Sequence, residues 1–168
     1  MDKTIKQTLF AAVALLCAGV TLEAAPINGS ITIKDGAHLN TNLVNTATQV
    51  TGWLNGANLP PTVVSRSGNF VTFVNVGDAV TMAAPWNFKS GLANLWKVGG
   101  FTFNLTASSI VMQANGFLNV SGTGTISGHG FTTTSGSWKF STQNPPANGV
   151  FSFSASTTAN PPTPTPTP

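Results

Sequence analysis

The side chains that can carry acid–base chemistry are few in this sequence. Beyond residue 24 they are two aspartates, Asp35 and Asp78, and two histidines, His38 and His129, with no glutamate. Two carboxylates on either side of a sugar would suit glycoside hydrolysis, but nothing in the spacing of the aspartates brings them together. The sequence also lacks the Gly-x-Ser-x-Gly elbow of a serine hydrolase. We therefore expect no catalytic residue, no enzymatic activity and no cofactor.

Turns explain the same four residues better than a catalytic or metal site does. Asp35 and His38 are separated by Gly-Ala, and Asp78 follows a Val-Gly pair, so both aspartates are expected to bond backbone amides in turns. His129 lies between two glycines, where a solvated loop tip is expected. A calcium site would need more acidic ligands than the chain offers. We therefore predict no metal site.

The tryptophans offer the remaining binding hypothesis. Trp53, Trp86 and Trp96 lie near the ends of predicted strands or loops, where an exposed indole face could stack on a sugar ring. Trp138 alternates with Phe140 and is expected in the core. Partly buried packing is the competing and favoured interpretation for each of the first three. A carbohydrate-binding module with a tryptophan platform therefore remains an alternative function.

The amino terminus has the pattern of a secretory signal peptide. Lys3 and Lys6 precede the small and apolar run 9–20, and two alanines follow, with cleavage expected after Ala24. As a helix that run would span only ~18 Å, short of the ~30 Å hydrocarbon core of a membrane. The only cysteine, Cys17, lies inside the signal and follows a bulky leucine, which disfavours lipid attachment. The expected mature chain is secreted and has no disulfide.

Composition indicates one all-β domain. The 168 residues include only 7% charged side chains, against ~25% in an average protein, and 24 Thr, 14 Ser and 16 Asn supply most of the polarity. These residues disfavour helices and suit strands joined by turns. The 11 Phe and 4 Trp are enough for a packed core. Positive charges are dispersed rather than clustered, so we expect no nucleic-acid partner.

Short stretches that alternate between apolar and polar residues recur along the chain, separated by glycine-rich turns. About nine strands with one apolar face each would bury those faces by stacking two antiparallel sheets in a β-sandwich, with a small β-barrel as the alternative. The only helical candidate is 90–97, which could equally be a loop. The predicted strands are 30–34, 49–54, 70–76, 79–82, 100–105, 109–113, 117–126, 136–142 and 150–156.

The carboxyl terminus changes character at Asn160. From there alternating Pro and Thr residues have no core-forming side chain and are typical of a stiff extended stalk or a frayed tail. The expected organisation is a signal peptide at 1–24, a β-sandwich domain at 25–159 and a Pro/Thr-rich tail at 160–168. No stable membrane span is expected in the mature chain.

Several stretches carry a resemblance to a known group of proteins. They are VTMAAPW at 80–86, LWKVGGFTF at 95–103, GTGT at 122–125, WKFSTQ at 138–143 and FSFSAS at 151–156. Over about 29–157 the chain resembles the secreted domain of bacterial proteins that carry a PEP-CTERM type sorting signal. In such proteins a Pro-Glu-Pro-like motif, an apolar helix and a basic end follow the domain.

The sequence departs from that pattern after Pro161-Pro162, where neither the apolar helix nor the basic end follows. What the resemblance implies is a role in the cell envelope, extracellular matrix or biofilm, without enzymatic activity. We therefore expect an exported structural or adhesive domain. Its expected partners are extracellular polysaccharide or envelope components.

Overall fold

A computed structural model describes residues 24–54, 57–144 and 151–163 of the chain. The predicted signal peptide, apart from Ala24, and the last five residues of the predicted Pro/Thr tail lie outside this described part. Strands dominate the described residues, as the composition predicts. The strands are β1 (Ser30–Leu39), β2 (Gln49–Gly52), β3 (Thr62–Arg66), β4 (Thr81–Met82), β5 (Trp86–Asn87), β6 (Leu92–Val98), β7 (Phe101–Ala114), β8 (Phe117–Ser127), β9 (Thr134–Gln143) and β10 (Phe151–Ala159).

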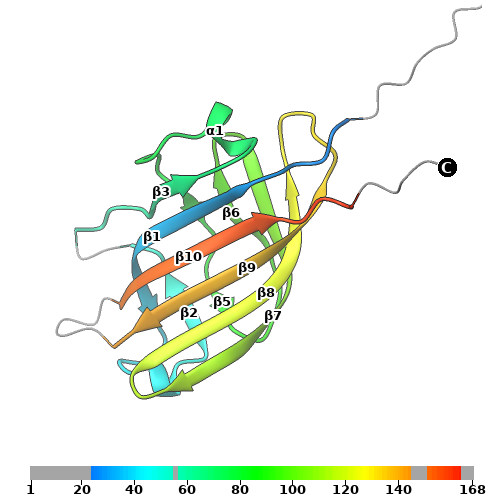
Figure 1. Cartoon of the computed structure of the whole chain (residues 1–168). Helices are drawn as coiled ribbons and strands as arrows, with labels where there is room; N and C mark the ends of the chain where they lie inside the picture. Colours follow the sequence, from blue (N-terminus) through cyan, green and yellow to red (C-terminus); the bar gives the residue numbers. More distant parts are fainter. Residues whose placement is uncertain (1–23, 55–56, 145–150, 164–168) are drawn as a thin grey trace, which may run out of the picture.

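The strands form one antiparallel sheet in the order β4-β6-β7-β8-β9-β10-β1-β2-β5, with β3 paired to β1. β1 changes partners along its length. Ser30 to Ala37 pair with β10, whereas His38 and Leu39 pair with β2 after a register shift. In Figure 1 the long strands β7 to β10 and β1 form one layer, and β2, β5 and β6 lie behind it. The all-β prediction is confirmed, and the arrangement is consistent with a β-sandwich rather than a clean barrel.

The core lies between these layers and is largely aromatic. In β9, every second residue from Thr134 to Thr142 is buried, so Trp138 and Phe140 both point inward. The indole of Trp86 lies at the centre, with ring centroids 6.0 Å from Trp138 and 5.3 Å from Phe140 in edge-to-face geometry. Such contacts stabilise a core beyond the burial of apolar area alone. The strand alternation therefore predicts the inward face of β9 correctly.

The strand predicted at 70–76 is wrong, because α1 (Phe70–Phe73) begins there. The Val74 amide donates to the Phe70 carbonyl and closes a single helical turn. Phe70 is fully buried against Phe101, with ring centroids 4.7 Å apart, whereas Val71 is 51% exposed. One buried ring therefore anchors the turn, and its docking overrides the β propensity of the Phe-Val-Thr-Phe sequence.

The helix considered at 90–97 is also wrong, because these residues belong mostly to β6. The register between β6 and β7 shifts between Leu92 and Trp96. Asn94 lies within this irregularity and has a φ of 51°. Its backbone N–H donates to the side-chain oxygen of Asn104. A bulge places Leu95 and Trp96 both in the core. The irregular strand thus imitates the apolar spacing of a helix.

Three further differences concern strand number and length. β3 and β5 were not expected, and β4 covers only the end of the predicted strand 79–82. The predicted strands 100–105 and 109–113 are one strand of 14 residues, β7, with register shifts against β8. The described residues therefore contain ten strands rather than about nine short ones. Val150, the predicted start of the last strand, lies outside the described residues.

Candidate functional site

The two aspartates have different structural settings. Asp78 lies in a turn, as predicted: its Oδ2 accepts a hydrogen bond of 2.7 Å from the Asn75 amide. The turn predicted between Asp35 and His38 is wrong, because both residues lie within β1, which continues to Leu39. Among the described residues, no three His, Cys, Asp or Glu side chains are grouped as metal ligands. The carboxylate of Asp78 therefore serves the turn in which it lies.

His129 is exposed, as a loop tip should be, but it is also held in place. Its ring stacks on Phe73 with centroids 3.8 Å apart, and its Nε2 lies 2.5 Å from the Gly99 carbonyl oxygen. Its φ of 51° is in the left-handed region. The histidine thereby connects the β8–β9 loop to α1 and to the β6–β7 turn. Its contacts are those of a structural residue.

The three tryptophans considered for sugar stacking are all buried. Trp53 is 4% exposed, and Trp86 and Trp96 are fully buried. Their indole N–H groups donate within the protein, to the Ala83 carbonyl at 2.6 Å, the Ser90 carbonyl at 3.3 Å and the Thr157 hydroxyl at 2.8 Å, respectively. A sugar ring needs an open aromatic face. The tryptophan platform is therefore wrong, and core packing is the role of all three residues.

The structure instead brings together small polar side chains on the outer face of β8, β9, β10 and β1. We call this surface the hydroxyl face. It consists of three rows of residues paired across the four strands, and every one of its side chains is at least partly exposed. The rows are Asn119, Ser141, Ser154 and Lys34; Ser121, Lys139, Ser156 and Thr32; and Thr123, Ser137, Thr158 and Ser30.

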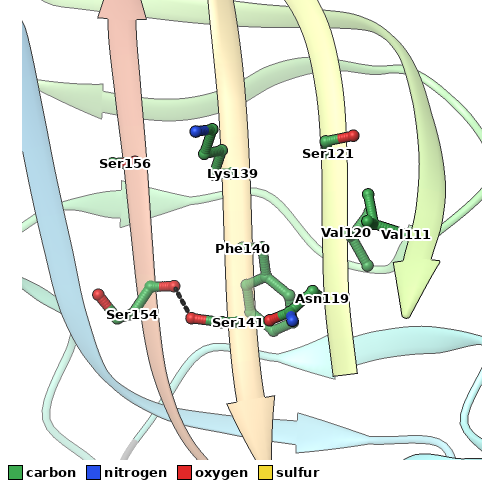
Figure 2. Close-up of a pocket in the computed structure, with 9 residues that line it drawn as sticks. All are labelled: Val111, Asn119, Val120, Ser121, Lys139, Phe140, Ser141, Ser154 and Ser156. Carbon is green, nitrogen blue, oxygen red and sulfur yellow. Dashed lines mark hydrogen bonds between the residues drawn. The ribbon is translucent and has the colours of Figure 1, made fainter. Parts of the chain in front are cut away.

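A hollow of about 360 Å³ lies on the hydroxyl face around Lys139. Figure 2 shows the residues that line it, which come from β7, β8, β9 and β10. The hydroxyl of Ser141 donates to the Ser154 carbonyl at 3.3 Å, within this lining. Val120 and Phe140 have buried side chains, so strand backbone forms the floor. Serine side chains are short, which leaves open space beside the longer Lys139.

One wall of the hollow is apolar. Val111 lines it from β7 and is 67% exposed. The register between β7 and β8 shifts between Ile110 and Met112, so Val111 has no partner in β8. Bulges of this kind redirect a side chain and are frequent beside binding sites. The hollow therefore combines hydroxyl groups, an ammonium group and one exposed aliphatic side chain.

The hydroxyl face has two positive charges and no negative one. Lys34 and Lys139 lie on either side of β10 and one row apart, which places their backbones about 12 Å from each other. Asp35 follows Lys34 but pairs with Phe153, whose ring is in the core, so it belongs to the opposite face of the sheet. No residue of the three rows carries a carboxylate. The charged side chains of the three rows are therefore all positive.

Comparisons with protein-family models, curated proteins and solved structures gave no match. The function is therefore inferred from the residues and their geometry.

The sequence reasoning missed the hydroxyl face, although part of its signal is visible in the chain. Asn119, Ser121 and Thr123 alternate along one strand, and Ser137, Lys139 and Ser141 do so along the next. What the sequence alone does not show is the register that aligns them.

Among the described residues, no helix has the length and hydropathy needed to cross a membrane.

Proposed function

We propose that the protein is an exported, non-enzymatic structural or adhesive domain of the bacterial envelope, extracellular matrix or biofilm. The observation that carries the proposal is that the chain enters and leaves the folded body at one place. The Thr132 amide donates to the Ala25 carbonyl at 3.0 Å. The Asn160 amide donates to the Ser135 carbonyl at 2.7 Å. Figure 1 shows both ends of the body on the same side.

This arrangement suits a domain that is attached at one end. The Pro/Thr sequence starts beside the entry point of the chain, and such sequences favour the extended polyproline II conformation, which holds a domain away from its attachment. The β7–β8 hairpin lies at the far end of the body (Figure 1), and the side chains of the hydroxyl face are all at least partly exposed. Both are available for contacts with the surroundings.

Two features of the sequence support the same role. Residues 1–24 have the charged, apolar and small-residue order of an export signal. The resemblance to the secreted domains of PEP-CTERM type proteins supports a location in the envelope or matrix. The polar surface is made mainly of hydroxyl and amide groups, which can form many weak hydrogen bonds with a partner. Such contacts are sufficient for a structural or adhesive role, which needs no catalytic group.

The test is the fate of the full chain in a bacterial host. The chain is expressed with a carboxyl-terminal epitope, and cytoplasmic, membrane, matrix and medium fractions are separated. We expect the mature protein in the matrix or envelope fraction, with Ala25 as its first residue by mass spectrometry. A Leu15→Arg variant, which interrupts the apolar run, should stay unprocessed in the cytoplasm. Recovery of the unaltered chain in the cytoplasm with Met1 intact would contradict the proposal.

The adhesive part of the role needs a separate measurement. Deletion of the gene from the producing bacterium should lower cell attachment or matrix mass, and the unaltered gene should restore it. Restoration by the Leu15→Arg variant would show that export is not required, and the proposal would then be wrong.

A further inference from the structure

We propose that the hydroxyl face binds an acidic polysaccharide and that Lys34 and Lys139 pair with carboxylates along the polymer. The inference rests on the proposed function, because it names the partner that an exported adhesive domain would hold. The proposed binding residues are the hydroxyl groups and lysines of this face, in place of the tryptophans, which are buried. Three properties of the face support it: its hydrogen-bonding groups, the shape of the hollow and its charge.

The hydrogen-bonding groups match those of a sugar. Each Ser or Thr hydroxyl donates one hydrogen bond and accepts others, and the amide of Asn119 does both. Sugar hydroxyls have the same dual capacity. Neighbouring residues of a row lie ~4.8 Å apart and successive rows ~6.7 Å apart, so the face presents such groups as a regular array. A polymer of hydroxylated rings can therefore bond at several points at once.

The hollow is suited to one sugar ring. A ring has polar edges and apolar C–H faces, and the hollow is lined both by Ser121 and Ser141 and by the exposed aliphatic side chain of Val111. Its volume of about 360 Å³ is at the small end of the range of ~300–1,000 Å³ for ligand sites. The lining of the hollow includes residues from two rows of the hydroxyl face, so a polymer bound in it would continue along the face.

The charge specifies an anionic polymer. Lys139 borders the hollow, and Lys34 lies about 12 Å away across β10, so the two ammonium groups would contact separate anions of one chain. The absence of carboxylates from the three rows leaves these cations uncompensated there. A neutral polymer would make the hydrogen bonds but not the two ion pairs.

A nucleic acid fits the face less well. Proteins that bind DNA strongly contact ~6–10 phosphates, and those that bind single strands add aromatic platforms. The three rows have two lysines and no aromatic side chain. The carboxylates of a polyuronate, with hydroxyls on every ring, suit the hydroxyl face better.

The experiment uses the full chain and polygalacturonate, with fully methyl-esterified polygalacturonate as the uncharged probe of the same backbone. Binding is measured by calorimetry at low salt. We expect binding to polygalacturonate that falls as salt is raised, and at least tenfold weaker binding to the ester. Lys34→Gln and Lys139→Gln should each weaken binding three- to fivefold, and the double variant about tenfold or more.

Matched variants test whether binding depends on the hydroxyl face or on positive charge anywhere on the protein. Lys89→Gln removes the same charge from an exposed turn outside the face and should leave the affinity unchanged. Val111→Asp should weaken binding at least as much as one lysine change. Val76→Asp, at a site that is 57% exposed near α1, should not. Unchanged melting temperatures would show that each variant is folded.

Several results would overturn the inference. They are failure to bind polygalacturonate, an affinity for the ester equal to that for polygalacturonate, or a loss of affinity with Lys89→Gln equal to that with Lys34→Gln or Lys139→Gln. Tighter binding to DNA than to polygalacturonate of the same total charge would also overturn it. If the protein reaches the matrix but does not bind polygalacturonate, the ligand is wrong and the proposed function stands. If it binds but stays in the cytoplasm, the proposed function is wrong.

Discussion

The two faces of β8, β9 and β10 differ completely although the same strands form them. The inner face carries large side chains such as Trp138 and Phe140, which are fully or almost fully buried. The outer face carries hydroxyl groups and Lys139. Successive side chains of a strand point to opposite sides, so neighbours in sequence are separated by the thickness of the sheet. Stability and recognition can therefore reside on opposite faces of one element.

The strongest test of this division is a change in the core against which the inner face packs. Trp86→Ala removes a fully buried indole that contacts the rings of Trp53, Phe88, Trp138 and Phe140. We expect the free energy of unfolding to fall by about 3–5 kcal/mol, because the cavity cannot be refilled by the surrounding rings. Urea denaturation followed by tryptophan fluorescence measures the loss. A loss below 1 kcal/mol would show that the core is not packed around Trp86.

A smaller effect compares two neighbouring threonines on β10. Thr157 is fully buried, and its hydroxyl accepts the indole N–H of Trp96 at 2.8 Å. Thr157→Val keeps the shape and removes this acceptor, so we expect a loss of about 1–3 kcal/mol. Thr158→Val, one residue further and exposed on the outer face, is the control. Equal losses for the two variants in urea denaturation would contradict the division into faces.

The smallest expected effect is on the outer face itself. Lys139→Gln removes the charge of an exposed side chain. We expect the free energy of unfolding to change by no more than about 0.5 kcal/mol, because surface substitutions away from special features are nearly neutral. Thermal unfolding monitored by circular dichroism checks this. A larger loss would mean that the lysine supports the fold, and its use as a binding residue would need another variant.

Local pattern was a good guide where a strand is regular. The predicted strands 117–126 and 136–142 nearly match β8 and β9, because strict alternation there reflects one buried and one exposed face. The pattern was misleading where tertiary contacts interrupt it. The bulge at Asn94 made a strand look helical, and the docking of Phe70 turned a strand-like sequence into a helical turn.

The candidate site was predicted less well than the fold. Large aromatic side chains can be either a core or a platform, and only the packing around Trp53, Trp86 and Trp96 shows that they form the core. The hydroxyl face depends on register across four strands, and one of them, β1, lies far from the other three in the sequence. Lys34 and Ser154 become partners through the pairing of β1 with β10. Sequence spacing carries no information about such a pairing.

Composition and alternation by themselves determined that this chain builds antiparallel sheets around an aromatic interior with few ionisable groups. These are properties of short segments, since the side-chain period of a strand is two residues and turns need only local conformations. The folded structure decided which strands became neighbours and therefore which outward side chains stand side by side. Long-range pairing and burial are cooperative, and they bring Lys34 and Lys139 to one surface although more than a hundred residues separate them along the chain.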